Sequence, residues 1–280
     1  MATPSLRRAI EIYRTEGRSN LRGKVSRLLR ERAQDGYWRL RGTRTVTRGG
    51  VTATFPTATM DEARTLRRLL RLESAMLSDL LAELRPDDVL YDVGAFTGLY
   101  TCFAVNALAD ENVVAFEPNP SNLERLRRNA AYNGSPRISE MVLSDASGTV
   151  EFDNPTRARE NWGARGSIAP DAGNESIRVE AHTGDELVER GELPAPTVVK
   201  IDVEGAELLV IEGLADALAS DRCRLVYCEV HRESDERRSI ESYGSTPGDV
   251  ERRLESLGFA TERLDDREAE FFLKGSKEST

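Results

Sequence analysis

The chain of 280 residues is long enough for one α/β domain with additions or for two small domains, and 39% of it is hydrophobic and 31% charged. No apolar run approaches the roughly 20 residues that a membrane-spanning helix needs, and the first residues lack the apolar core of a signal peptide, so we expect a cytoplasmic protein. The three cysteines lack a C-x-x-C spacing and indicate neither a disulfide framework nor a zinc site.

Charge is unevenly distributed along the chain. Residues 1–50 carry 13 basic and 4 acidic side chains, a net charge of +9, whereas the remainder carries −18. The acidic body argues against nucleic-acid binding. Residues 5–15 and 20–34 have the pattern of basic amphipathic helices. This N-terminal helical extension is predicted either to contact an anionic membrane through residues 1–35 or to pack on the body as a helix pair.

Residues 42–55 alternate in character and are rich in threonine and valine, which predicts a β-hairpin around Gly49-Gly50. Leucines at helical spacing then predict one long helix over residues 60–84. We place a domain boundary after the hairpin, so that residues 1–55 form a basic helical arm with a hairpin and residues 56–280 form the larger domain.

From residue 89 the pattern alternates between strand and helix. Strands are predicted near 89–94, 112–117, 138–144, 197–203, 224–230 and 270–274, and helices near 98–109, 120–133, 206–219 and 247–257. The second of these helices is expected to begin at Asn119-Pro120-Ser121, with a capping box from Ser121 to Glu124. This alternation predicts an α/β fold with a doubly wound, mostly parallel sheet, which binds ligands beyond the carboxyl ends of its strands.

About fifty residues between the third and fourth of these strands lack the alternating pattern. Residues 149–152 and 176–180 resemble short strands, and the segment 153–175 between them is rich in Asn, Gly and Pro. A loop of this length in a compact domain often has a function. We expect it to meet a substrate, and its Arg157, Arg159 and Arg165 would suit an acidic or polyhydroxylated one.

The glycine turn after the first of these strands predicts a nucleoside site. It reads Asp92-Val93-Gly94-Ala95-Phe96-Thr97-Gly98, and an acidic residue, Glu117, follows the next strand. Dinucleotide-binding turns place a glycine where this chain has Phe96, so that the backbone can approach a pyrophosphate, and no phosphate-binding G-K-[ST] follows. The turn therefore favours S-adenosylmethionine (SAM), with its ammonium at Asp92 and its ribose at Glu117. The alternative is that the glycines serve backbone geometry alone.

Charged residues also follow two later strands. Lys200, Asp202 and Glu204 share one strand face, as do Glu229 and His231. Charges inside apolar strands are costly unless they are paired or used, which predicts a site. His231 is favoured as a general base, and the predicted catalytic residues are His231, Glu229, Asp202 and Glu204. No metal ion is predicted, although the carboxylates would suit a divalent cation or simple pairing with Lys200 and arginines. His182 is expected to have a structural role.

Several of these motifs together resemble a known family. They are Asp92-Val93-Gly94-Ala95, Gly98-Leu99-Tyr100-Thr101, Phe116-Glu117-Pro118-Asn119-Pro120, Leu143-Ser144-Asp145, Lys200-Ile201-Asp202-Val203-Glu204-Gly205-Ala206-Glu207 and Glu229-Val230-His231. Over about residues 85–275 the chain resembles the FkbM-type SAM-dependent methyltransferases. The resemblance implies a seven-stranded, Rossmann-like class I methyltransferase fold. It also implies that SAM is held by Asp92, Gly94, Ala95, Gly98, Glu117, Pro118, Asn119, Ser144 and Asp145. Phe96 departs from the family, whose members often carry Asn there.

The resemblance further implies O-methylation. The expected acceptor is a hydroxyl or carboxylate of a sugar or glycan, including a lipid-linked or cell-surface glycan, and the alternative acceptors are a small natural product or a lipid. A hydroxyl acceptor must lose a proton, whereas a carboxylate needs no base. Two rival classes are a nicotinamide-dependent oxidoreductase and a non-catalytic membrane-associated binding module.

Overall fold

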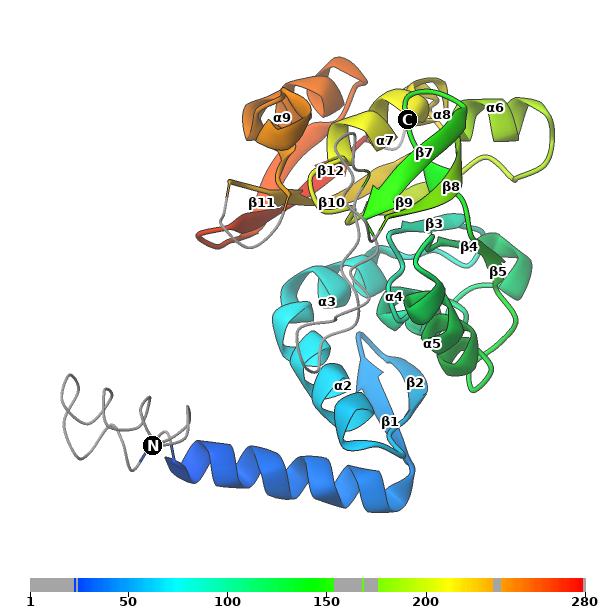
Figure 1. Ribbon diagram of the computed structural model, residues 1–280. Helices are drawn as coiled ribbons and strands as arrows, with labels where there is room; N and C mark the ends of the chain where they lie inside the picture. Colours follow the sequence, from blue (N-terminus) through cyan, green and yellow to red (C-terminus); the bar gives the residue numbers. More distant parts are fainter. Residues whose placement is uncertain (1–22, 24, 154–167, 169–175, 234–237, 279–280) are drawn as a thin grey trace, which may run out of the picture.

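The computed structural model describes residues 23, 25–153, 168, 176–233 and 238–278 (Figure 1). Its centre is a seven-stranded sheet in the order β11-β12-β10-β9-β3-β4-β5, in which β12 runs antiparallel to both neighbours and the pairs from β10 to β5 are parallel. The strands are β3 (Leu90–Val93), β4 (Val113–Phe116), β5 (Arg137–Ser139), β9 (Val198–Ile201), β10 (Leu225–His231), β11 (Ala260–Asp266) and β12 (Glu270–Ser276). The predicted α/β class with a mostly parallel sheet is confirmed.

Helices cover both faces of this sheet (Figure 1). One face carries α2 (Met60–Leu72), α3 (Ser74–Glu83), α4 (Leu99–Ala104) and α5 (Pro120–Ala130), and the other carries α6 (Gly184–Glu189), α7 (Glu207–Gly213), α8 (Ala215–Ala219) and α9 (Pro247–Ser256). The 3-10 turns are η1 (Asp110–Asn112) and η2 (Ile240–Tyr243). This sandwich buries both faces of the central strands, which explains why those strands are continuous apolar runs.

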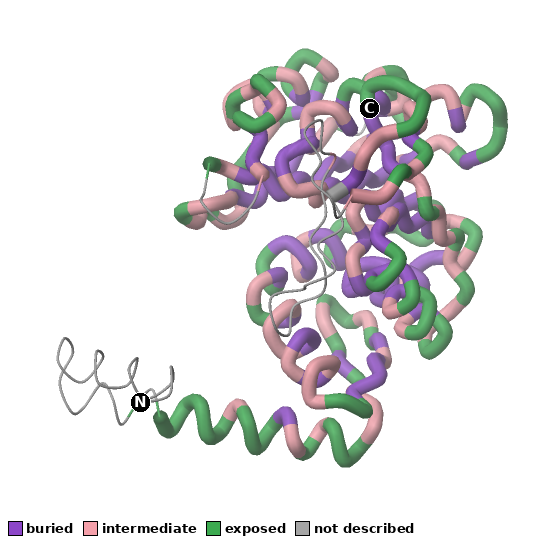
Figure 2. Tube along the Cα trace, in the orientation of Figure 1, coloured by how far each residue is buried: buried purple, intermediate pink, exposed green. Residues whose placement is uncertain are grey.

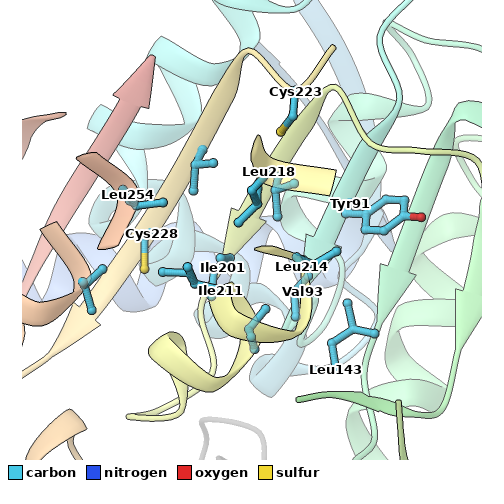
Figure 3. Close-up of a cluster of buried hydrophobic side chains, with 14 of the residues drawn as sticks. Tyr91, Val93, Leu143, Ile201, Ile211, Leu214, Leu218, Cys223, Cys228 and Leu254 are labelled. Carbon is cyan, nitrogen blue, oxygen red and sulfur yellow. The ribbon is translucent and has the colours of Figure 1, made fainter. Parts of the chain in front are cut away.

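Alternation along the central strands divides the core into two parts. Leu90 and Val198 pack with α2, α3 and α4, whereas Tyr91 and Val199, one residue on, pack on the other face. Figure 3 shows part of this second core, where Tyr91 and Ile201 lie near the helix residues Leu214 and Leu218. The same alternation decides which strand residues face the cavity described below.

A small second sheet lies beside the main one and has the order β6-β8-β7. Its strands are β6 (Val142–Leu143), β7 (Gly148–Asp153) and β8 (Ser176–His182). The single strand predicted over residues 138–144 is therefore wrong, because Ser139 pairs with Phe116 of the main sheet whereas Leu143 pairs with His182 of the small one. The two short strands predicted around residues 153–175 are confirmed.

Three predicted helices are shorter or divided. The helix over 60–84 breaks at Glu73, the helix over 98–109 ends at Ala104, and the helix over 206–219 divides at Leu214. Near Ala104 the side chain of Asn106 donates to the backbone carbonyl of Cys102, which competes with helix continuation. Strand β11 was not predicted, because its sequence carries four charges in seven residues and its residues are not fully buried.

The expected capping box at Ser121 is also wrong. Asn119 is the N-cap of α5, and its side-chain oxygen accepts from the backbone N–H groups of Ser121 and Asn122. Pro120 occupies the first turn, where its missing N–H group does no harm.

The chain before the main sheet forms a helix over residues 25–41, here called the arm helix, and then the predicted hairpin of β1 (Thr43–Arg48) and β2 (Val51–Pro56). The arm helix projects from the body and is largely exposed (Figure 2). The predicted helix over residues 5–15 lies outside the described residues, whereas the one predicted over 20–34 corresponds to the start of the arm helix. The hairpin packs against the body through Val46, Ala53 and Phe55, and the boundary after residue 55 stays a prediction. Within the described residues, no helix has the length and apolar character required to cross a membrane.

Candidate active site

A cavity opens at the carboxyl ends of the central strands. It holds about 1220 Å³, including space open to solvent, and it combines apolar walls with a group of carboxylates. The lining residues come from α2, the helix break at Glu73, the turn after β3, the ends of β4, β9 and β10, and the small sheet. This is where a doubly wound sheet places its ligands.

The glycine turn forms one wall of this cavity through Gly94, Ala95 and Phe96. Gly94 has a φ of +75°, and a Cβ there would lie 1.8 Å from the carbonyl oxygen of Asp202. A Cβ on Gly98 would meet Leu126 of α5 at 2.4 Å. Both glycines therefore allow close packing of the turn against neighbouring elements, so part of the glycine pattern has a structural cause.

Strained backbone also marks this cavity. Among the described residues, the two non-glycine residues with positive φ are Phe96 at 52° and Glu204 at 48°, and both line the cavity. Such conformations cost free energy and tend to persist where a site requires them.

Glu117 lies at the carboxyl end of β4 and is held by the turn. Its carboxylate accepts the backbone N–H groups of Phe96 at 2.8 Å and Asn119 at 2.9 Å, and the Asn122 amide at 3.3 Å. Burial raises the pKa of Glu117 to about 7, although these hydrogen bonds pull in the opposite direction. The side chain lines the cavity, as the ribose-binding prediction requires, and Asn122 is an additional lining residue that the sequence interpretation missed.

Asp92 has a different environment from the one expected. It is fully buried, its Oδ1 lies 3.1 Å from the Nζ of Lys200, and its Oδ2 accepts from the backbone and hydroxyl of Thr101. Lys200 is its register partner on β9 and also donates to the carbonyl of Gly94. Burial opposes the charge of Lys200, but the Asp92 carboxylate outweighs it and raises the lysine pKa. The Asp92 carboxylate is thus paired within the protein, and its contact with the SAM ammonium stays a prediction.

The four predicted catalytic residues do come together. The Nε2 atom of His231 lies 3.7 Å from Asp202 Oδ1, 3.8 Å from Glu204 Oε2 and 3.7 Å from Glu229 Oε1. Asp202, Glu204 and Glu229 line the cavity. His231 is 1% exposed and is not among the residues of the described chain that line it. The carboxylates thus stand between the imidazole and the cavity.

The surroundings of His231 weaken the case for a general base. Its Nδ1 atom lies 2.5 Å from Oε1 of Glu207, a buried residue at the start of α7. Burial disfavours the imidazolium, but the carboxylates of Glu204, Glu207 and Asp202 outweigh it and raise the pKa of His231 to about 9. With this pKa the ring is already in its positively charged imidazolium form at neutral pH and cannot accept a further proton. The base role therefore remains a prediction that these surroundings do not favour.

Glu73 is a cavity residue that the sequence interpretation missed. It sits at the break between α2 and α3, is 9% exposed, and accepts a hydrogen bond from the hydroxyl of Tyr100 at 3.0 Å. Burial and the nearby Asp202 carboxylate raise the pKa of Glu73 to about 7. Its position in the sequence could have indicated this role, because Glu73 interrupts the apolar helix face that runs from Leu66 to Leu77.

The remaining predicted cofactor residues lie at different distances from the cavity. Pro118 lines it, whereas Asn119 is buried as the cap of α5. Ser144 is buried and its hydroxyl donates to the exposed Asp145 at 3.1 Å. Beside them the apolar Val142 and Leu143 line the cavity. The roles of Asn119, Ser144 and Asp145 toward SAM stay predictions.

Two other predictions concern residues near the small sheet. Arg157, Arg159 and Arg165 lie outside the described residues. Ile168, which is described, lines the cavity and bridges to Phe152 of β7. His182 is partly buried at the end of β8 and lies 3.9 Å from Glu180, outside the described cavity wall, in keeping with a structural role.

Comparison with known proteins places this geometry in a family. The profile described as the Methyltransferase FkbM domain matches residues 92–261, which include the glycine turn, Glu117 and the strand-end cluster. Hexuronic acid methyltransferase AglP of Haloferax volcanii is 34% identical over 231 residues, which cover 82% of this chain and 87% of that protein. 31-O-demethyl-FK506 methyltransferase FkbM of Streptomyces tacrolimicus is 32% identical over 177 residues, covering 53% of this chain and 67% of that one.

Among solved structures, the chain is similar to the methyltransferase FkbM from Methylobacillus flagellatus. The TM-score is 0.47 at 16% identity, and the match covers 71% of this chain and 46% of that one.

Proposed function

The chain belongs to the FkbM methyltransferase family and is a SAM-dependent methyltransferase of class I fold, and we propose that it methylates an oxygen of a sugar, most specifically of a uronic acid within a glycan. The observation that supports this proposal is the cavity at the strand ends, where Glu117 on one side and Asp202 and Glu204 on the other face a common space. Family membership sets aside the oxidoreductase and the non-catalytic module.

The residues of the cavity fit SAM. Glu117 is a buried carboxylate with a raised pKa, and two ribose hydroxyls would supply the hydrogen bonds that favour its charged form. Val142, Leu143 and Phe152 offer an apolar wall suited to an adenine ring. We assign these residues, with Phe96 and Pro118, to the cofactor. The bound cofactor supplies a methyl group on a sulfonium, which is already activated for displacement.

The remaining residues would orient the acceptor and handle its proton. For a hydroxyl acceptor, the carboxylate of Glu204, with Asp202 beside it, would take up the proton as the oxygen displaces the sulfonium sulfur from the methyl carbon, which leaves a neutral thioether. For a carboxylate acceptor the oxygen attacks directly and no proton moves. Because His231 lies behind these carboxylates, we assign it to positioning them rather than to contact with the acceptor.

The proposed acceptor class rests on the names of the relatives. AglP is named for a hexuronic acid, and a second relative, 2-O-methyltransferase NoeI of Sinorhizobium fredii, is named for methylation at an oxygen. We propose that the acceptor belongs to a lipid-linked or cell-surface glycan and that the enzyme methylates it in the cytoplasm. The alternative acceptors are a natural product and a lipid.

The arm helix supports a second proposal, that the enzyme binds an anionic membrane surface. Its exposed apolar side chains include Val25, Leu28, Leu29 and Leu40, and five arginines lie on the same helix. Other residues of the proposed contact, before residue 25, lie mostly outside the described residues. Sedimentation with anionic vesicles tests this proposal.

The function is tested by incubating the full chain with SAM and oligosaccharides that contain either a uronic acid or the matching neutral sugar. Mass spectrometry should show the mass of one added methylene on the uronic acid acceptor. Glu117→Gln should reduce transfer at least tenfold, whereas Glu111→Gln, an exposed carboxylate outside the cavity, should not. Transfer to the neutral sugars alone would contradict the uronic acid assignment, and transfer to none would contradict a sugar acceptor.

A further inference from the structure

The cluster behind the cavity wall contains an imidazole nitrogen without a hydrogen-bond partner. His231 is 1% exposed, and its Nε2 atom is buried and has no partner among the described residues. Leaving a buried nitrogen without a partner costs free energy, so such an atom requires an explanation. The carboxylates of Asp202 and Glu229 face it at 3.7 Å, a separation too long for a hydrogen bond.

The same separations suit ligands of one ion. The nitrogen of His231 and one oxygen each of Asp202 and Glu229 all lie within 4.8 Å of one another. Metal bonds to imidazole nitrogen and carboxylate oxygen are roughly 2.0–2.2 Å long, which places two ligands of one ion roughly 3–4 Å apart. The two nitrogen–oxygen separations of 3.7 Å lie within this range, and the separation of the two carboxylate oxygens is at most 4.8 Å.

The other nitrogen of the ring is already fixed. Glu207, which is fully buried, accepts from the backbone N–H of Gly205 at 2.9 Å and lies 2.5 Å from Nδ1 of His231. A carboxylate that accepts a hydrogen bond from Nδ1 orients the ring and directs Nε2 at the metal position, which is the usual outer-shell arrangement of a metal-binding histidine. Binding of the ion would displace the proton from Nε2.

The carboxylates of Asp202 and Glu229 also have partners on the side away from His231. Lys200 lies 3.7 Å from the second oxygen, Oδ2, of Asp202, so Oδ1 is the one that faces His231. Glu229 shares a hydrogen bond with Glu270 on the neighbouring strand β12. The carboxylates thus have partners on one side and converge on His231 on the other.

Charge supplies a further argument. The carboxylates of Asp202, Glu204 and Glu207 surround one histidine. Lys200, which lies 3.7 Å from Asp202, is also paired with Asp92. This wall would repel the carboxylate of a uronic acid. A divalent cation would neutralise it and offer the acceptor an attractive contact.

We propose that Asp202, Glu229 and His231 bind one divalent transition-metal ion, with Glu204 at its cavity side. One imidazole with two carboxylates favours Mn²⁺, Fe²⁺ or Zn²⁺ over Mg²⁺ and Ca²⁺. Because Asp202 and Glu229 line the cavity and His231 does not, the open coordination positions face the cavity. There the ion would hold an acceptor oxygen while Glu204 remains available for the proton of a hydroxyl. The acceptor-holding role rests on the proposed function, but the site itself does not.

The site is tested by metal binding to the full chain after chelator treatment and dialysis, with Mn²⁺ as the probe. Calorimetry should show one site, and pulsed electron paramagnetic resonance should show coupling of Mn²⁺ to a histidine nitrogen. Asp202→Asn and Glu229→Gln should each weaken binding at least tenfold, and His231→Gln should remove the nitrogen coupling. Circular dichroism and thermal unfolding would establish that each variant is folded, and the nitrogen signal of the wild-type protein does not depend on any variant.

Glu73→Gln is the matched control, because Glu73 is a buried carboxylate of the same cavity outside the proposed ligand set. It should weaken Mn²⁺ binding less than threefold. An equal loss for Glu73→Gln and Asp202→Asn would show diffuse attraction by an acidic cavity and overturn the site, as would Mn²⁺ binding without nitrogen coupling or no binding of either Mn²⁺ or Zn²⁺.

A separate measurement distinguishes the ion from the proposed function. Methyl transfer at full rate in excess chelator would overturn the acceptor-holding role and leave methyl transfer in place. Mn²⁺ binding with nitrogen coupling, combined with no transfer to any sugar, would support the site and count against the sugar acceptor.

Discussion

Lys200 and Asp92 form a buried ion pair directly beneath the cavity. Both side chains are at most 2% exposed, and each also makes a further hydrogen bond, Lys200 to the carbonyl of Gly94 and Asp92 with Thr101. The sequence placed Asp92 near the site through the glycine turn, and Lys200 through its charge within an apolar strand. It did not show that they pair, since pairing depends on the register between β3 and β9, which are separated by about a hundred residues.

Replacing Lys200 by methionine should therefore destabilise the protein strongly. Lys200→Met leaves the Asp92 carboxylate buried without its partner, and breaking such a pair costs about 3–5 kcal/mol. Urea unfolding would measure the loss. The double variant Lys200→Met/Asp92→Asn removes the stranded charge and should recover at least half of it. If the single variant loses less than about 1 kcal/mol, the pair is not important for stability.

Glu117 should make cofactor binding depend on pH. Its pKa is raised to about 7 by burial, and ribose hydroxyls would donate to the charged form, so SAM would bind the deprotonated protein. Affinity should be highest above pH 7 and fall below it, with the dissociation constant rising about tenfold from pH 8 to pH 6. Calorimetry at several pH values measures this.

Glu117→Gln is the control, because it removes the titration of residue 117 and leaves that of every other group, including the groups of SAM itself. The variant should bind more weakly, and its remaining pH dependence should be much flatter than that of the wild-type protein. Equal pH profiles for the two proteins would show that another group causes the dependence and would remove the argument for ribose binding at Glu117.

At the level of elements, the glycine turn joins β3 to α4 and determines how closely β3 and the chain after β9 can approach. Gly94→Ala should be severely destabilising, because the added Cβ would lie 1.8 Å from a backbone oxygen and the φ of +75° is strained for alanine. Gly42→Ala has the same φ of +75° but no atom within 4 Å, so it isolates the strain. We expect about 1 kcal/mol for Gly42→Ala and at least about 3 kcal/mol for Gly94→Ala in chemical unfolding. Similar losses would show that the close approach is unimportant.

The order of helices and strands was largely predictable, because central strands buried on both faces form apolar runs bounded by turn residues. The division of residues 138–144 between two sheets was not, since both parts are short and apolar and only tertiary pairing separates them. The break at Glu73 was missed for a similar reason. Local helix preference continues through it, whereas its hydrogen bond to Tyr100 comes from a distant segment.

The candidate site was predicted in its composition but not in its arrangement. Period-two alternation and shared strand ends brought Asp202, Glu204, Glu229 and His231 together correctly. No pattern in the sequence indicated that Glu207, which begins α7, orients the ring of His231, or that His231 lies behind the carboxylates. Those facts depend on the turn at Glu204 and Gly205, both with positive φ, and on the packing of Glu207 against the end of β10.

At the scale of the whole molecule, an acidic body carries a basic, partly apolar arm. In the arm helix, which is largely exposed (Figure 2), Asp35 is buried and pairs with Arg67 of α2, whereas Leu28 and Leu29 are exposed. An enzyme with this polarity would approach an anionic membrane with its arm while its body is repelled, which would hold the cavity at a distance from the lipid surface.

The full chain should therefore sediment with vesicles rich in phosphatidylglycerol, and binding should weaken as salt is raised. Leu28 and Leu29 are 57% and 61% exposed, so Leu28→Ser/Leu29→Ser should reduce vesicle binding at least tenfold with little change in thermal stability. Tyr132→Ser is the matched control, because Tyr132 is 52% exposed on the body and should not contribute. The reason for this expectation is that an amphipathic helix inserts its apolar side chains into the membrane and is held at the anionic surface by its positive charges. Equal binding of all three proteins would place the membrane contact elsewhere. If the wild-type chain does not bind, the proposed membrane contact is refuted.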